Sequence, residues 1–190
     1  MSGIECWRST SLDTKERLKK LIEENALKRG EFILASGKKS NYYLNGKMVS
    51  LESEGLYLMG KLIHNIAEEL NVDAVGGPTL GADPIVGAVL TVAAMHEQKL
   101  EGFIVRKTTK DHGTKSLIEG PLKEGAKVLM VEDVVTTAGT WLKAAEAVEA
   151  YGCEIVAMVC LVDRQEGAEE NVKKAGYKFM PLFKREDFGL

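Results

Sequence analysis

Two adjacent carboxylates, Glu132 and Asp133, come directly after an apolar run that begins at Val128. Small and hydroxyl-bearing residues follow at 136–140 and lead into a pattern typical of a helix. The first turn of a helix has unpaired N–H groups and partial positive charge, so this segment suits a phosphate. The carboxylates would repel that phosphate and need hydroxyl donors or a metal ion instead. Together, the carboxylate pair and the loop before the helix predict a site for a sugar phosphate.

A second segment, 106–116, holds the densest cluster of cations in the chain and no apolar residue. With nothing to bury, it is expected to form a mobile loop. Arg106 directly follows an apolar strand pattern, so that cation is anchored at the end of a strand. Such a loop can close over a polyphosphate and exclude water. A solvated surface loop is the competing interpretation.

A third segment places Arg164 after the apolar run 159–162. Its planar guanidinium suits a carboxylate or an imide edge. A salt bridge with Asp163 or Glu166 is an equally good interpretation of the spacing. The loop 77–84, rich in small residues, is either a second anion-binding loop or a plain turn between strand and helix.

These segments should lie at strand ends of an α/β fold. The pattern predicts strands at 73–76, 102–106, 127–132, 154–162 and 178–182, and helices at 12–29, 53–70, 85–96, 139–151 and 168–175. Short strands at 31–34 and 41–44 flank a turn and suggest a hairpin outside the main sheet. Apolar strands separated by helices indicate a central, mostly parallel sheet flanked by helices, which binds ligands at the carboxyl ends of its strands.

The composition limits the classes of protein that this chain can be. With 190 residues, 45% hydrophobic and 28% charged, it has the size of one globular domain spanning 1–190. A net charge of -3 argues against nucleic-acid or membrane-surface partners. The sequence shows neither a long apolar span nor a signal-peptide pattern, so a cytoplasmic location is expected. Its three cysteines lack metal-ligand spacing.

Four segments together resemble a known family. Residues 132–140 resemble the phosphoribosyl-pyrophosphate motif of type I phosphoribosyltransferases. Residues 106–113 resemble the catalytic loop of orotate phosphoribosyltransferases, residues 32–43 their substrate-covering hairpin, and residues 162–166 their orotate-binding segment. The matches come in the family's order. The resemblance implies the type I phosphoribosyltransferase fold, in which residues 1–50 contribute an N-terminal hood of helix and hairpin.

The implied reaction transfers ribose 5-phosphate from phosphoribosyl pyrophosphate to orotate, giving orotidine 5'-phosphate and pyrophosphate for pyrimidine biosynthesis. Mg²⁺ would bridge the ribose hydroxyls and the pyrophosphate, with no direct protein ligand. No protein nucleophile is required, because positioned charge can stabilise the cationic ribose and the departing anion. The family's mobile loop serves the neighbouring subunit, which implies a homodimer.

The resemblance also implies roles for single residues. The catalytic group would be Lys107, Lys110, His112 and Asp133. Orotate would contact Arg164, Thr136 and the backbone around Tyr43 and Leu44. Phosphoribosyl pyrophosphate would be bound by Arg106, Lys107, Lys110, His112, Glu132, Asp133, Val134, Val135, Thr136, Thr137, Ala138, Gly139 and Thr140.

The chain departs from the family's pattern in two places. Some members have a lysine where this chain has Ala35, and an aromatic residue and a lysine where it has Leu80 and Gly81. Both differences remove positive charge from the diphosphate site. The family's pyrophosphate loop often contains a non-proline cis peptide, which would fall near Thr79-Leu80.

Two other functions remain open at this stage. One is a phosphoribosyltransferase for a purine base, which an orotate assay would distinguish. The other is a non-catalytic regulator that senses phosphoribosyl pyrophosphate. A sensor would have no use for Lys107, Lys110 and His112, so the basic loop favours an enzyme.

Overall fold

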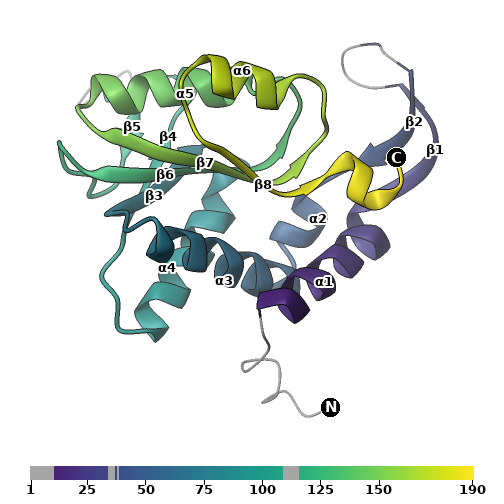
Figure 1. Cartoon of the computed structure of the whole chain (residues 1–190), viewed down its shortest axis with the longest axis horizontal. Helices are drawn as coiled ribbons and strands as arrows, with labels where there is room; N and C mark the ends of the chain where they lie inside the picture. Colours follow the sequence, from purple (N-terminus) through teal and green to yellow (C-terminus); the bar gives the residue numbers. More distant parts are fainter. Residues whose placement is uncertain (1–10, 34–36, 38, 109–115) are drawn as a thin grey trace.

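A six-stranded sheet forms the middle layer of the protein (Figure 1). The computed structural model describes residues 11–33, 37, 39–108 and 116–190. The strands are β3 (Ala74–Pro78), β4 (Glu101–Val105), β5 (Ile118–Glu119), β6 (Lys127–Val135), β7 (Glu154–Asp163) and β8 (Phe179–Lys184). Their order is β5-β4-β3-β6-β7-β8, and every neighbouring pair is parallel except β4 with β5. The mostly parallel sheet predicted from the sequence is therefore confirmed.

The strand order reverses direction at the centre of the sheet. From β3 the chain continues outward to β4, whereas from β6 it continues to the opposite side through β7 and β8. β3 and β6 are neighbours, with Ala74 opposite Val128 and Gly76 opposite Met130. In open α/β sheets a crevice forms beyond the strand ends at such a reversal, and ligands bind there.

Helices cover both faces of the sheet. On one face lie α1 (Ser11–Leu21), α3 (Ser53–Glu69) and α4 (Ala82–Met95); on the other lie α5 (Gly139–Ala150) and α6 (Ala168–Lys174) (Figure 1). Strand residues alternate between the two layers, as the pleat requires. Leu129 packs in the core with Ile63 of α3, and its neighbour Met130 packs in the core with Trp141 of α5.

The N-terminal segment forms a separate two-stranded sheet. After α1 come a π-helical turn, η2 (Ile22–Ala26), the antiparallel strands β1 (Leu27–Ile33) and β2 (Lys39–Leu44), and a short helix, α2 (Lys47–Ser50). The hairpin was predicted, but the helix expected over 12–29 already ends at Ala26. The last predicted helical residues pair with β2 instead, Leu27 with Leu44 and Arg29 with Tyr42. Gly30 thus lies inside a strand, at a bulge with φ of 148°.

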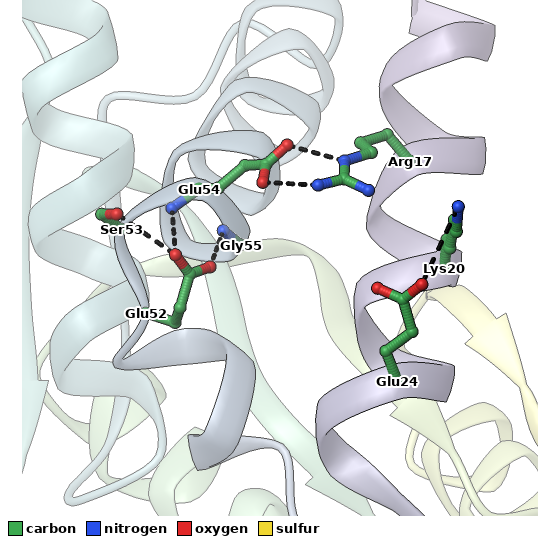
Figure 2. A network of polar contacts seen from close by, with 7 residues as sticks. All are labelled: Arg17, Lys20, Glu24, Glu52, Ser53, Glu54 and Gly55. Carbon is green, nitrogen blue, oxygen red and sulfur yellow. Dashed lines mark hydrogen bonds and ion pairs between the residues drawn. The ribbon is translucent and has the colours of Figure 1, made fainter.

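Charged side chains connect α1 to the start of α3 (Figure 2). The Arg17 guanidinium donates to both carboxylate oxygens of Glu54, at 2.7 Å each. Glu52 caps α3 by accepting hydrogen bonds from the N–H groups of Glu54 and Gly55, at 3.0 and 2.7 Å. These backbone bonds lower the pKa of Glu52. These contacts fix α1 against α3 on the same face of the sheet.

Other differences from the predicted elements are local. β6 continues three residues beyond its predicted end, because Glu132 lies opposite Cys160 and Val134 opposite Val162 on β7. The short elements α2, β5 and η3 (Arg185–Phe188) were not predicted, since two to four residues show no periodicity. Within the described ranges, no helix combines the length and the apolar character that crossing a membrane requires.

Candidate active site

The adjacent carboxylates Glu132 and Asp133 lie near the end of β6, at the point where the strand order reverses. Asp133 is buried, and its Oδ2 accepts a hydrogen bond of 2.7 Å from Nζ of Lys47. The backbone holds one further oxygen of each carboxylate: the Val134 N–H donates to Asp133 Oδ1 at 2.8 Å, and the Asp133 N–H donates to Glu132 Oε1 at 3.0 Å. The pair is therefore held rigidly.

Burial and mutual repulsion change how these groups bind protons. Burial, followed by the charge of Asp133, raises the pKa of Glu132 to about 8. Burial by itself would lower the pKa of Lys47, but the hydrogen bond to Asp133 and the charges of both carboxylates raise it. The carboxylate pair thus binds a proton readily and attracts hydrogen-bond donors or cations.

The start of α5 supplies the anion-binding half of the site. Ala138 adopts a left-handed conformation with φ of 62° and precedes the helix, and its own side chain provides no cap hydrogen bond to that helix end. Asn171 of α6 donates from Nδ2 to the carbonyl of Thr137 at 2.9 Å and fixes the loop from behind. Thr137, Gly139 and Thr140 are exposed. The first amides of α5 are therefore available to a phosphate.

The loop after β3 approaches the carboxylates from the other side. Its Thr79–Leu80 peptide is cis, as the resemblance implies. A Cβ atom on Gly81 would lie 1.8 Å from Glu132 Oε1 and 2.7 Å from Asp133 Oδ1. Glycine allows this approach while Glu132 keeps its position. The departure from the family's lysine therefore goes together with the position of Glu132 in this chain.

One cavity of about 510 Å³ joins these parts. Its lining combines the two carboxylates, the loop before α5, the loop after β3 and three lysines. The lining residues are Lys47, Thr79, Leu80, Gly81, Lys107, Glu132, Asp133, Val134, Val135, Thr136, Thr137, Ala138, Gly139, Thr140, Trp141 and Lys143. Such a cavity can bind one ligand at two points, with the phosphate of the ligand at the start of α5 and its hydroxyl groups at Glu132 and Asp133.

Arg106 and Lys107, the two cations at the start of the basic loop, have different surroundings. Lys107 lines the cavity, whereas Arg106 forms an ion pair of 3.1 Å with Glu119 of β5. Arg106 faces a neighbouring hollow of about 590 Å³ that shares Thr79 and Lys107 with the first. Lys110 and His112, like Ala35 of the hairpin, lie outside the described residues.

Arg164 lies beside the end of β6, because its N–H donates to the carbonyl of Val135 at 3.0 Å. Its side chain pairs with Glu166 at 2.9 Å, donates from Nε to the Tyr42 hydroxyl at 3.2 Å and lies over the Tyr42 ring. The salt bridge considered from the sequence is therefore present. Tyr43 is half exposed against Phe32, Leu44 is buried, and neither they nor Arg164 line the cavity.

Several residues of this region escaped the sequence analysis. Lys47 and Lys143 line the cavity, Asn171 donates a hydrogen bond to the loop before α5, and the Tyr42 hydroxyl accepts one from Arg164. Tyr42 lies within the hairpin segment 32–43 but was given no role there, and the other three belong to no motif with recognisable spacing. Lys47 lies 86 positions from the aspartate that it contacts, in a helix of four residues. Only its position soon after a predicted strand could have drawn attention to it.

Comparison with known proteins agrees with this geometry. The model of the phosphoribosyl transferase domain family matches residues 50–181. Orotate phosphoribosyltransferase of Aquifex aeolicus is 44% identical over 173 residues, which cover 90% of this chain and 94% of that protein. A crystal structure of Mycobacterium tuberculosis orotate phosphoribosyltransferase with Fe(III) dicitrate superposes with a TM-score of 0.82 at 34% identity, covering 93% of this chain and 99% of that one.

A second structure of the mycobacterial enzyme is a complex with 5-phospho-alpha-D-ribosyl 1-diphosphate. It gives a TM-score of 0.78 at 32% identity, with 93% of this chain and 99% of that one covered. The likeness therefore extends over nearly the full length of both chains.

Proposed function

The chain belongs to the orotate phosphoribosyltransferase family, and from that premise we propose that it transfers ribose 5-phosphate from phosphoribosyl pyrophosphate to orotate. The products are orotidine 5'-phosphate and pyrophosphate, and the reaction serves pyrimidine biosynthesis. One observation carries the proposal most strongly: a carboxylate pair and the N-terminus of α5 line a single cavity at the reversal of the strand order.

The sugar phosphate spans the cavity. Its 5'-phosphate lies on the amides and hydroxyls of residues 136–140, where the dipole of α5 favours negative charge. Its ribose hydroxyls donate to Glu132 and Asp133, which keep free lone pairs beside their backbone bonds. The pyrophosphate then lies toward Gly81 and Lys107, which line the same cavity.

The site suits Mg²⁺ held mainly by the substrate. Among the described residues, no three His, Cys, Asp or Glu side chains gather in a group that could hold a metal ion. Mg²⁺ commonly keeps several waters and binds substrate phosphates with few protein ligands. When bound, the ion neutralises charge on the pyrophosphate. Glu132 and Asp133 would orient the ribose hydroxyls of the ligand that carries the ion.

Catalysis proceeds through charge stabilisation. As the bond at the anomeric carbon breaks, the ribose becomes cationic and the pyrophosphate gains negative charge. Asp133 lies on the ribose side, and the cations Lys107, Lys110, His112 and Arg106 stabilise the leaving group. Arg106 gives up Glu119 to do so, since the two are paired in the described structure.

Orotate lies between the hairpin and the end of β6. Arg164 binds its carboxylate or a ring carbonyl, with Thr136 and the backbone at Tyr43 and Leu44 around the ring. The test is steady-state kinetics of Arg164→Ala, which should raise the KM for orotate at least about tenfold. The KM for phosphoribosyl pyrophosphate should change little, and Lys19→Met on α1 serves as a remote control. Equal effects on both KM values, or turnover of purine bases instead of orotate, would refute this assignment.

We further propose a homodimer in which the basic loop reaches the neighbouring site. Co-expression of Lys110→Ala with Asp133→Asn tests it. If the loop acts in trans, each mixed dimer has one site with both groups intact, and about a quarter of the wild-type activity returns. If the loop acts within its own subunit, no site is complete and activity stays at the level of the single variants.

The chain is further proposed to be one domain that works in the cytoplasm. Leu18 and Tyr42 of the hood share a continuous hydrophobic core with Val159 of the main sheet. The described residues of the hood, 11–33 and 39–50, are therefore expected to unfold together with the rest. The buried free thiols of Cys153 and Cys160 are consistent with a reducing compartment.

A further inference from the structure

Hydrogen bonds and close packing of residues 45–47 hold Lys47 beside the two carboxylates. The Asn45 side chain accepts a hydrogen bond of 3.2 Å from the Lys47 N–H, and the Asn45 N–H donates to the carbonyl of Ala26 at 3.0 Å. The backbone at Gly46 presses onto β6: a Cβ atom there would lie 2.9 Å from Val134 Cγ2 and 3.2 Å from Asp133 Cβ. The short helix α2 therefore starts in direct contact with the site.

The Asp133 carboxylate is held by two donors that come from different parts of the fold. Oδ1 accepts from the Val134 N–H at 2.8 Å, and Oδ2 accepts from Nζ of Lys47 at 2.7 Å. The backbone bond alone would leave the carboxylate free to rotate about it. The second bond fixes the plane of the carboxylate, and each oxygen keeps one lone pair for another donor.

The charge around Asp133 also depends on Lys47. The side chain of Asp133 is only 9% exposed and lies next to Glu132, whereas the side chain of Lys47 is 38% exposed and reaches the pair from the hood. The cavity lining includes two further lysines, Lys107 and Lys143. Within the described part of the chain, Lys47 is the cation that contacts the Asp133 carboxylate directly.

We propose that Lys47 is a positioning residue for the sugar: its ammonium fixes the Asp133 carboxylate so that the free lone pairs of that carboxylate face the ribose hydroxyls. The inference rests on the proposed function, because it takes Asp133 as the acceptor of those hydroxyls. It adds a role for the hood, which then contributes to sugar binding as well as covering the base.

The first test compares Lys47→Met with Lys47→Arg. Methionine keeps much of the length and removes the charge, so the KM for phosphoribosyl pyrophosphate should rise about tenfold or more. Because Lys47 acts on the sugar and not on the base, the KM for orotate should change less than about threefold. Arginine restores a cation and should recover most of the loss. Lys19→Met on α1 is the matched control and should behave as the wild type.

The second test is a double-mutant cycle with Asp133→Asn. If Lys47 acts through Asp133, adding Lys47→Met to Asp133→Asn causes no further loss of affinity. A further loss of similar size would show that Lys47 contacts the ligand itself and would overturn the positioning role. An unchanged KM in Lys47→Met, or a fall in kcat alone, would overturn it as well.

Direct binding separates this inference from the function on which it rests. Calorimetry with phosphoribosyl pyrophosphate and Mg²⁺ should show the same loss of affinity in Lys47→Met without any base present. Absence of orotate turnover in the wild type would refute the proposed function, while the calorimetric comparison would still decide the role of Lys47. Equal thermal midpoints of Lys47→Arg and wild type would show that the fold is intact.

Discussion

Gly81→Ala should separate sugar binding from folding. An added Cβ at this position would lie 1.8 Å from Glu132 Oε1 and 2.7 Å from Asp133 Oδ1, where ordinary contact begins at 3.4 Å. Both clashing atoms are the ends of side chains. The backbone can therefore stay in place, and the Glu132 carboxylate has to move away.

The size of the effect follows from what Glu132 loses by moving. An oxygen displaced from 1.8 Å to 3.4 Å gives up its hydrogen bond of 3.0 Å from the Asp133 N–H. Because Glu132 keeps its proton up to about pH 8, this is a hydrogen bond to a neutral group at neutral pH and contributes about 0.5–1.5 kcal/mol. Since the same oxygen is proposed to accept from the ribose, we expect the KM for phosphoribosyl pyrophosphate to rise about two- to tenfold. The free energy of unfolding should fall by about 1–3 kcal/mol, the usual range for overpacking.

Two other glycines provide controls for the same substitution. A Cβ on Gly77 would lie 2.1 Å from the backbone carbonyl oxygen of Val131, which cannot move alone, so Gly77→Ala should destabilise the fold much more strongly. A Cβ on Gly87 of α4 meets nothing within 4 Å. Gly87→Ala should leave KM unchanged and stabilise the helix by up to about 1 kcal/mol.

The assay combines orotate absorbance kinetics at varied phosphoribosyl pyrophosphate with urea denaturation of the three variants. A Gly81→Ala enzyme with the wild-type KM would refute the reasoning, because it would show that the position of Glu132 does not matter to the sugar. The same conclusion would follow if Gly87→Ala raised KM as much as Gly81→Ala.

Three further outcomes are expected. Because the pKa of Glu132 is about 8 against an ordinary 4.5, the folded chain holds one more proton than the unfolded chain between these pH values, and the free energy of unfolding should fall with rising pH by up to about 1.4 kcal/mol per pH unit. Glu132→Gln should flatten this slope in urea titrations from pH 5 to 8, and equal slopes in variant and wild type would contradict the prediction. Arg17→Ala removes an exposed two-pronged ion pair with Glu54 and should lower the unfolding free energy by only about 0.5–1 kcal/mol, measured by thermal denaturation. Tyr42→Phe removes a bond to Arg164 Nε and should raise the KM for orotate about two- to tenfold while sparing that for phosphoribosyl pyrophosphate.

The sequence was sufficient for features that depend on local pattern. Apolar strands and the helices between them predicted a parallel sheet, and the pattern at residues 132–140 predicted the strand, loop and helix start at which we propose that the phosphate binds. Both depend on residues close together in the chain, where period and helix-end chemistry are visible. The hairpin was also visible, because its turn and short apolar runs are adjacent.

Features that depend on distant contacts could not be predicted in the same way. The helix expected through Arg29 stops early because cross-strand pairing with Tyr42 outweighs helix propensity. The bond of Lys47 to Asp133 and that of Arg164 to Tyr42 join residues 86 and 122 positions apart. No periodicity encodes such pairs, which depend on how the hood docks on the sheet.

Two cations that we propose to bind substrate each have a carboxylate partner within the chain. Arg106 pairs with Glu119, and Arg164 pairs with Glu166. An incoming anion at Arg106 or Arg164 must compete with a carboxylate already in place, so a stray phosphate or chloride gains little there. Affinity should therefore depend on ionic strength less steeply than the number of cations suggests, because fewer charges begin unpaired.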